Sequence, residues 1–147
     1  MILELRRARA DDCQRLHEWV NAPDARAAAL TSRAPIEKAR HRAWFAERLA
    51  DADCRIWIIE AGGEAIGEVR LDRGAAETEI DIFVSAGHRG RGVARRAIGE
   101  AQQRWPARAW VARVRSGNAA SRHLFESLGF AVAEDAGDHL VYRRRDG

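Results

Sequence analysis

The stretch from Ile80 to Gly99 (IDIFVSAGHRGRGVARRAIG) combines bare backbone with positive charge, directly after an alternating apolar run that ends at Val84. Three glycines lie among five basic residues, and a run typical of a helix follows. Glycine leaves its amide N–H uncovered and tolerates unusual φ angles. Consecutive amides at a helix start, aided by the helix dipole, bind anions. The stretch therefore predicts an anion site at the mouth of a strand; the alternative is an ordinary glycine-rich turn with solvated arginines.

Two well-known nucleotide-binding loops can be tested against this stretch. The dinucleotide fingerprint requires G-x-G-x-x-G; Gly90 and Gly92 supply the first two glycines, but Arg95 stands at the third. The Walker loop requires G-x-x-x-x-G-K-[ST]; Gly87 and Gly92 have the spacing, but valine and alanine follow instead of lysine and a hydroxyl residue. Both interpretations therefore fail on the residues themselves.

The elements that must position this loop follow from hydrophobic periodicity and from turn and cap residues. They alternate in a regular order that is typical of one mixed α/β domain over residues 1–147. The expected elements are a strand at Ile2–Ala8, a helix capped by Asp11 or Asp12 and running to Val20, a loop at 21–26, a helix opened by Pro35 with Ile36, Trp44, Phe45 and Leu49 on its apolar side, strands at 54–61 and 64–72 around a Gly62-Gly63 hairpin turn, a strand at Thr78–Ser85, a helix at Gly92–Arg104 stopped by Pro106, a strand at Ala107–Ser116, a helix capped by Asn118 that Gly129 ends, and strands at 130–134 and 139–145.

Composition sets the class of protein. The 147 residues are 46% hydrophobic, and no apolar run approaches the roughly 20 residues that a membrane span needs. The first residues, MILELRRARADD, do not resemble a signal peptide, so the expected location is the cytoplasm. Cys13 and Cys54 lie far apart and outside any metal-type spacing, so we expect two buried free thiols and no metal. The net charge of +3 favours anionic partners of some kind.

RGRGVA (Arg89–Ala94) and NAASRHLFESLGF (Asn118–Phe130) resemble the two signature motifs of the GNAT family of N-acetyltransferases. The first is similar to R-x-x-G-x-G/A, the acyl-CoA pyrophosphate loop of the family, and it lies between a strand and a helix as the family requires. The second lies one helix and one strand downstream. The resemblance covers essentially the whole chain. It implies an α/β GNAT fold: a central mixed, mostly antiparallel sheet of about seven strands, with helices on both faces and strands 4 and 5 splayed.

The resemblance also implies where acetyl-CoA binds as co-substrate. The amides of the Arg89–Ala94 loop would hold its pyrophosphate, and the end of the fourth strand would splay from the fifth and offer backbone groups to the pantetheine arm, which Asn118 would contact. The expected cofactor-binding residues are Ile82, Phe83, Val84, Arg89, Gly90, Arg91, Gly92, Val93, Ala94, Asn118 and Ser121.

The expected reaction is attack of a neutral amine on the thioester carbonyl. A backbone N–H of the fourth strand would stabilise the oxyanion, and a base would take the ammonium proton. Glu79 and Asp81 share one face of that strand by period two, and Glu79 is the preferred base; the alternative is that both are solvated. Many family members carry a tyrosine acid seven residues after the asparagine. Phe125 stands there, which leaves the acid open, with Ser121 and His123 nearby.

The acceptor side is expected in the first third of the chain. WVNAPDAR (19–26) and HRAWF (41–45) resemble a GNAT subgroup that acetylates nucleotide-linked amino sugars or the N-termini of ribosomal proteins. The sugar-modifying branch is the preferred likeness, because guanidinium suits a diphosphate and indole suits a base or sugar. Packing in the core is the alternative for the aromatic residues. The expected acceptor-binding residues are Trp19, Asn21, Arg26, His41 and Trp44.

Three functions remain open on the sequence. The first is an acetyl-CoA-dependent N-acetyltransferase that acts on a primary amine of a small acceptor. The second is a protein N-terminal or aminoacyl-tRNA acetyltransferase on the same fold, because the fold does not choose the substrate. The third is a non-catalytic acyl-CoA-binding module. The expected partner is a small-molecule amine, with no membrane and no nucleic acid; a homodimer stays open.

Overall fold

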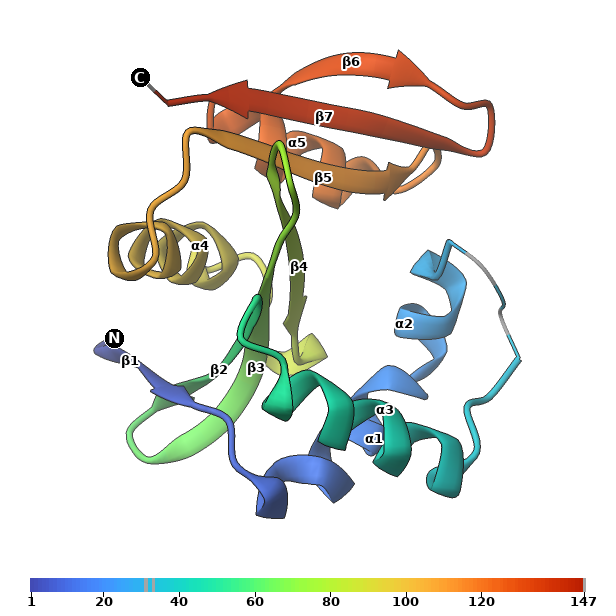
Figure 1. Cartoon of the computed structure of the whole chain (residues 1–147), viewed down its shortest axis with the longest axis vertical. Helices are drawn as coiled ribbons and strands as arrows, with labels where there is room; N and C mark the ends of the chain where they lie inside the picture. The colour runs from blue at the N-terminus through green and yellow to red at the C-terminus, as the bar shows by residue number, and fades with distance from the viewer. Residues whose placement is uncertain (31, 33, 147) are drawn as a thin grey trace.

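The computed structural model describes the chain except for residues 31, 33 and 147 (Figure 1). Helices and strands alternate much as the sequence predicts. In chain order the elements are β1 (Leu3–Arg7), the 3-10 helix η1 (Ala10–Asp12), α1 (Cys13–Val20), α2 (Pro23–Ala28), α3 (Lys38–Ala50), β2 (Cys54–Ala61), β3 (Glu64–Arg73), β4 (Thr78–Val84), the 3-10 helix η2 (Ala86–His88), α4 (Val93–Arg104), β5 (Ala109–Arg115), α5 (Ala119–Ser127), β6 (Ala131–Asp135) and β7 (His139–Arg145).

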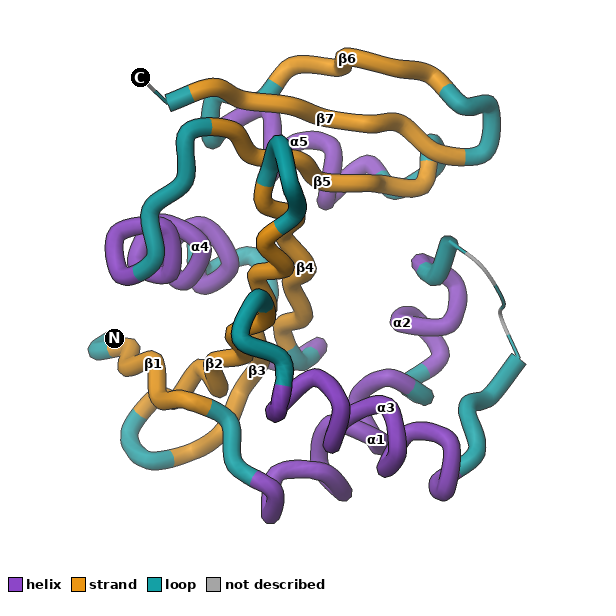
Figure 2. The backbone as a smooth tube through the Cα atoms, in the orientation of Figure 1, coloured by secondary structure: helices purple, strands orange, loops and turns teal. Residues whose placement is uncertain are grey.

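One seven-stranded sheet organises the molecule, in the order β1-β2-β3-β4-β5-β7-β6. Every neighbouring pair is antiparallel except β4 and β5, which are parallel. The β4–β5 ladder consists of Thr78 opposite Trp110 and Glu79 opposite Val111, and it ends there. The β5–β7–β6 group then diverges from the β1–β4 group (Figure 2). The expected fold class, splayed strands included, is therefore confirmed.

Strand β2 shows how the sequence packs helices on both faces of the sheet. Its run CRIWIIEA is apolar at nearly every position, which is typical of a strand buried on both sides. Trp57 and Ile59 belong to the larger core, which α4 and α5 cover, whereas Ile56 and Ile58 pack with Phe45 of α3 in a second core. Alternate side chains of β2 point to opposite faces of the sheet, and each face is therefore covered by its own helices.

Two sequence expectations are wrong in the first third of the chain. Residues 23–28 form the short helix α2 instead of a loop, because Pro23 takes the first-turn position that suits proline. The next helix begins at Lys38, with Glu37 as its N-cap, and not at Pro35. Its buried side chains are His41 and Phe45, while the other expected apolar residues of this helix stay at least partly exposed.

The structure also tests the expected glycine turn and the two expected free thiols. Gly62 and Gly63 have φ angles of 59° and 82° and form the β2–β3 turn. Both cysteines are free; Cys54 is buried, but Cys13 is only half-buried, which corrects the expectation for that thiol. In the described part of the chain, no helix combines the length and apolar character needed to cross a membrane.

Gly67 lets β3 and β4 approach closely at the end of β4, where it lies opposite Val84. A Cβ atom at this position would lie 2.3 Å from the carbonyl oxygen of Phe83, which is far inside van der Waals contact. We expect Gly67→Ala to lower the free energy of unfolding by about 1–3 kcal/mol, the usual cost of overpacking. Gly99→Ala is the control: it lies in α4 with open space around it, so alanine should stabilise the helix slightly. Thermal unfolding of both variants checks this, and equal melting temperatures would contradict the close approach.

Candidate active site

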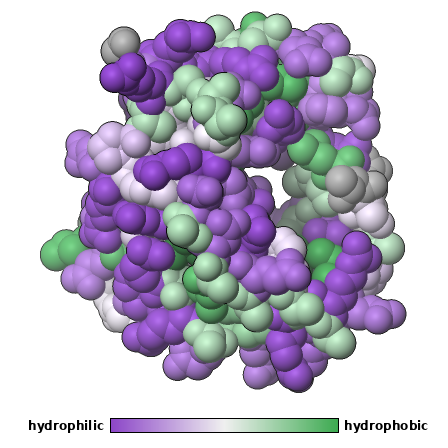
Figure 3. All heavy atoms as spheres, in the orientation of Figure 1, coloured by the Kyte–Doolittle hydropathy of each residue, from purple (hydrophilic) through white to green (hydrophobic). Residues whose placement is uncertain are grey.

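A cleft of about 1260 Å³ opens where β4 and β5 separate. Its walls come from α1, α2 and α3, from β3 and β4, from the beginning of α4, from the end of β5 and from α5 along its length. The space-filling view shows the molecule hollowed between β4 and α2 (Figure 3). The volume is that of a site for a sizeable small molecule. We call this space the cleft below.

The loop before α4 presents bare backbone to the cleft. Gly90 and Gly92 have left-handed φ angles of 74° and 76°, and Gly92 is the N-cap of α4. A Cβ atom on either glycine would meet nothing within 4 Å, so open space lies over both. The first amides of a helix have no partner within the helix and favour an anion. Val93 and Ala94 also line the cleft, while Arg91 is exposed and does not.

Arg89 connects this loop to α2. Its Nε donates a hydrogen bond to the carbonyl oxygen of Val84 over 2.8 Å, and its Nη1 forms an ion pair with Asp24. The hydrogen bond from Arg89 lowers the pKa of Asp24 below the usual range of an aspartate. The guanidinium also lies over the Phe83 ring, 5.6 Å from its centroid. Arg89 therefore holds a positive charge at the junction of β4, the loop and α2.

The end of β4 forms one wall of the cleft through Ile82, Phe83 and Val84. Because the ladder with β5 ends at Glu79, the backbone of this segment faces the opening on its β5 side. The N–H and C=O groups that point toward β5 can bond an extended ligand between the two strands, apart from the Val84 carbonyl, which accepts from Arg89. The structure thus brings the expected strand segment and the glycine loop to the same cleft.

Helix α5 brings two more of the expected residues to the cleft. Asn118 caps the helix, because its Oδ1 accepts a hydrogen bond from the amide of Ser121 over 3.2 Å. Both residues line the cleft, as does His123. Phe125 does not: its side chain is only 3% exposed, and its ring packs against Phe130 and Tyr142. The position expected to carry the acid therefore faces the core.

The two carboxylates predicted on β4 are placed differently. Asp81 lines the cleft. Glu79 lies nearer the closed end of the β4–β5 ladder, outside the cleft lining, and its Oε1 accepts a hydrogen bond from Arg113 over 2.8 Å. Sharing one strand face was a correct inference, but only the residue nearer the splay reaches the cleft.

Glu68 of β3 is a cleft carboxylate that the sequence analysis missed. It lies opposite Phe83 in the β3–β4 register, beside the splayed segment. Loss of solvent on the cleft wall raises its pKa to about 7; the negative charges of Asp81 and Asp72 also raise the pKa, while Arg70 lowers it. In the sequence, Glu68 is one polar residue of an alternating strand, and its only signal is the register with β4.

The expected acceptor-side aromatic residues do gather at the cleft. Trp19 stacks on Phe83 with 5.4 Å between ring centroids. The Arg70 guanidinium lies over the Trp44 ring, 5.1 Å from its centroid. His41 is buried beside Trp44. Burial lowers the pKa of His41, and the nearby His17 lowers it further, so the ring is neutral at pH 7.

Asn21 and Arg26 shape the acceptor-side backbone. The backbone N–H of Ile36 donates to Oδ1 of Asn21 over 2.7 Å, and Nδ2 of Asn21 donates to the carbonyl oxygen of Ile36 over 2.9 Å. Arg26 lines the cleft, but its guanidinium donates to the carbonyl oxygens of Val20, Ser32 and Ala34 over 2.7, 3.0 and 3.2 Å. Both side chains therefore fix the segment between α1 and α3.

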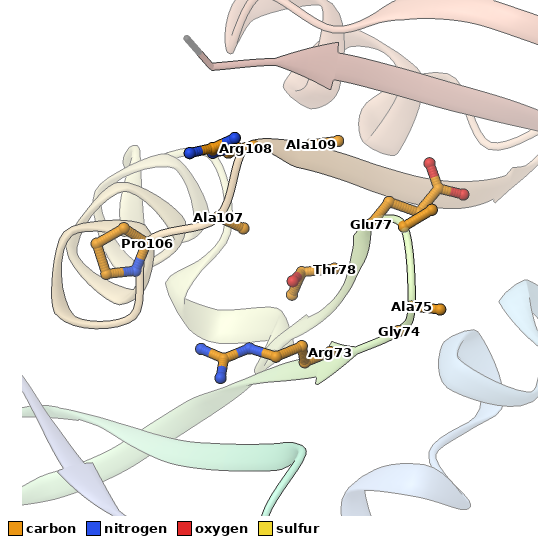
Figure 4. Close-up of a pocket in the computed structure, with 10 residues that line it drawn as sticks. Arg73, Gly74, Ala75, Glu77, Thr78, Pro106, Ala107, Arg108 and Ala109 are labelled. Atoms are coloured by element: carbon orange, nitrogen blue, oxygen red, sulfur yellow. The ribbon is translucent and has the colours of Figure 1, made fainter.

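A second, smaller cavity of about 200 Å³ lies at the closed end of the β4–β5 ladder (Figure 4). The β3–β4 turn and the residues before β5 line it, including Arg73, Glu77 and Arg108. Glu77 is paired with Arg143, 2.9 Å from Nε to Oε2. No residue expected to do chemistry lines this cavity, so the candidate site is the cleft.

Comparisons with known proteins agree with this geometry. A model of the acetyltransferase (GNAT) domain family matches residues 3–131. The chain is 31% identical to the L-amino acid N-acyltransferase MnaT of Escherichia coli K12, over 140 residues that cover 88% of this chain and 80% of MnaT. Among solved structures it resembles yncA of Salmonella typhimurium, determined with its cofactor acetyl-CoA, with a TM-score of 0.81, 23% identity, and coverage of 100% of this chain and 96% of that one.

A spermidine N-acetyltransferase of Vibrio cholerae, in complex with CoA and spermine, has the same fold. Its TM-score is 0.81 at 20% identity, with coverage of 96% of this chain and 92% of that one. At such identities the solved structures show the fold and do not identify the substrate.

Proposed function

Because this chain belongs to the GNAT family of acetyl-CoA-dependent N-acetyltransferases, we propose that its acceptor is a small zwitterionic primary amine of about amino-acid size. The observation that carries this proposal is the distribution of charge along the cleft. Arg89 and the bare amides of the glycine loop line the cleft together with the carboxylates of Glu68 and Asp81, and Asp24 pairs with Arg89. The uncovered amides suit an anionic cofactor, and the carboxylates suit a cationic acceptor group.

The glycine loop fits acetyl-CoA, which when bound supplies the acetyl thioester. The open space over Gly90 and Gly92 leaves room for a diphosphate against the first amides of α4, and Arg89 adds a guanidinium. The free backbone edge of β4 from Ile82 to Val84 would hold the pantetheine arm, with the Asn118 amide on the opposite wall. A backbone N–H of the same edge would donate to the developing oxyanion.

The acceptor side fits an ammonium group and a carboxylate together. Glu68 and Asp81 offer negative charge to the ammonium, and Arg70 offers positive charge to the carboxylate, with its Nη1 3.9 Å from Asp81. The indoles of Trp19 and Trp44 line the same space and suit an apolar side chain. The name of the MnaT relative, an L-amino acid N-acyltransferase, supports the same class of acceptor.

A nucleotide-linked amino sugar is the less favoured acceptor. That interpretation relied on Arg26 to bind a diphosphate, and Arg26 already bonds three backbone carbonyls. The bond to Val20 is partly buried, so withdrawing the guanidinium from it would cost about 1–3 kcal/mol, whereas the bonds to Ser32 and Ala34 are exposed and water can replace them.

A thiol-release assay with a panel of amines tests the proposal. We expect turnover with L-methionine or L-phenylalanine, and a KM at least tenfold higher for the matching amino acid amide, which keeps the amine but lacks the carboxylate. Spermidine, an alanine-initiated peptide and a nucleotide-linked amino sugar are the competing acceptors. A higher kcat/KM for any of these three would overturn the proposed acceptor class, and binding of acetyl-CoA without turnover on any amine would indicate a non-catalytic module.

A further inference from the structure

Glu68 occupies a distinctive place on the cleft wall. The β3–β4 register sets it opposite Phe83, in the segment of β4 that has already left β5. Just before it, the β2–β3 register shifts between Ile59 and Glu60, and the close approach at Gly67 pins β3 against β4. The backbone that carries Glu68 is thus held from both sides, which suits a group that must meet a substrate in one position.

The titratable groups around Glu68 come from three elements. Arg70 and Asp72 are on β3, and Asp81 is on β4. His41 of α3 lines the same cleft and is neutral at pH 7. The residue of β2 opposite Glu68 is Ile58, which is apolar and fully buried. Desolvation together with Asp81 raises the pKa of Glu68 to about 7, against the positive charge of Arg70. A base is most effective when its pKa is near the working pH.

We propose that Glu68 is the general base that accepts a proton from the acceptor's ammonium group, an inference that rests on the proposed function. The carboxylate takes one proton and leaves a neutral amine. The amine nitrogen then attacks the thioester carbonyl carbon, and the C–N bond forms while the C–S bond breaks. The nitrogen's surplus proton passes to the departing sulfur, giving the free thiol, and Glu68 returns its proton to solvent. Asp81, whose Oδ2 lies 3.9 Å from Arg70 Nη1, adds negative charge beside Glu68 and helps to hold the ammonium group.

Glu68→Gln keeps the size of the side chain and removes its basicity. With acetyl-CoA and L-phenylalanine, we expect kcat to fall at least a hundredfold, while acetyl-CoA affinity by calorimetry stays within about twofold of wild type. The rate of the wild type should rise through pH 7 as Glu68 ionises, and the variant should lose this acid limb. Glu64→Gln is the matched control, because Glu64 is an exposed glutamate on the same strand outside the cleft lining. Wild-type-like turnover in Glu68→Gln would overturn the assignment.

Asp81→Asn tests the electrostatic part of the inference. Because the Asp81 charge raises the pKa of Glu68, its removal should move the acid limb of the rate to lower pH. A shift to higher pH, or no shift, would contradict the coupling. Glu79→Gln separates the two candidate bases: if it, and not Glu68→Gln, abolishes the acid limb, the base is Glu79.

A readout without any acceptor separates this inference from the proposed function. In protein labelled with ¹³C at the glutamate carboxyl carbons, one resonance should titrate near pH 7 and be missing from Glu68→Gln. If every glutamate titrates near the ordinary value of about 4.3, the base assignment is overturned, whichever amine is acetylated. If the resonance titrates near pH 7 but no small zwitterionic amine is acetylated, the acceptor class fails while the poised carboxylate stands.

Discussion

Replacing Gly92 with glutamate is expected to abolish measurable acetyl-CoA binding while the fold is retained. Gly92 is the N-cap of α4 and has a φ angle of 76°. The open space over it is where a diphosphate would meet the helix amides. A glutamate there fills the space, places a negative charge against another, and forces a side chain into the left-handed region. Calorimetric titration with acetyl-CoA measures the loss, and circular dichroism reports the fold.

Two further variants separate charge from backbone strain. Gly99→Glu adds the same carboxylate to the same helix, in open space away from the loop, and should bind acetyl-CoA nearly as well as wild type. Gly92→Asn adds a side chain without charge, and asparagine tolerates the left-handed region, so its affinity should lie between the other two. Unchanged affinity in Gly92→Glu would show that the glycine loop does not hold the diphosphate.

The parts of the site that the sequence predicts are those that depend on local structure. The glycine loop is a strand, a turn and a helix start within one short stretch, so its uncovered amides follow from residue type and spacing. The Asn118 cap is predicted in the same way, whereas the place of both at the cleft was implied by the resemblance to the GNAT family. Local periodicity also gives the order of the strands along the chain, and with it the fold class.

The missed residues depend on contacts between distant segments. Alternation places Glu79 and Asp81 on one face of β4, but the end of the β4–β5 ladder decides which of them reaches the cleft. Glu68 becomes visible only through the β3–β4 register. Phe125 turns toward the core because Phe130 and Tyr142 from other elements complete its packing. No pattern within a single segment of the sequence predicts how deeply these side chains are buried or which distant residues they contact.

The roles predicted for Asn21 and Arg26 show a related limit. Both side chains lie on the acceptor side, as the sequence pattern indicates, but they bond backbone groups of the segment between α1 and α3. A polar residue in a functional region can bind a ligand or hold the chain that forms the wall, and its type does not distinguish the two. The free backbone carbonyls that it can reach decide the matter, and only the folded chain shows them.

Asp12→Ala is expected to cost about 1.5–3 kcal/mol of unfolding free energy at pH 7, the range for hydrogen bonds to a charged group, because Arg6 is 23% exposed and keeps its ion pair with Glu60. The Asp12 side chain is 2% exposed and accepts two hydrogen bonds from the Arg6 guanidinium, over 2.7 and 2.8 Å. The amide of Arg9 donates a third, over 2.8 Å. This carboxylate joins β1 to α1, the helix that carries Leu16 and Trp19 to the cleft.

The same contacts give the loss a pH dependence of definite sign. Burial alone raises the pKa of Asp12. The hydrogen bonds from Arg6 and Arg9 and the Arg6 charge together lower the pKa by more than burial raises it, so the net pKa is below the usual range. A depressed folded-state pKa stabilises the fold above the unfolded value of about 3.9, and this stabilisation disappears as the pH falls through the folded value. The difference between wild type and Asp12→Ala should therefore be largest near neutral pH and shrink below about pH 4.

Urea denaturation at pH 7 and pH 3 measures this difference. Asp11→Ala is the control, because the neighbouring Asp11 side chain is 77% exposed and its ion pair with Arg9 spans 3.4 Å; such a surface pair should change stability by no more than about 0.5 kcal/mol at either pH. Equal losses in the two variants would mean that burial does not strengthen the Asp12 contacts. A gap between wild type and Asp12→Ala that widens in acid would reverse the sign argued here, and with it the depressed pKa of Asp12.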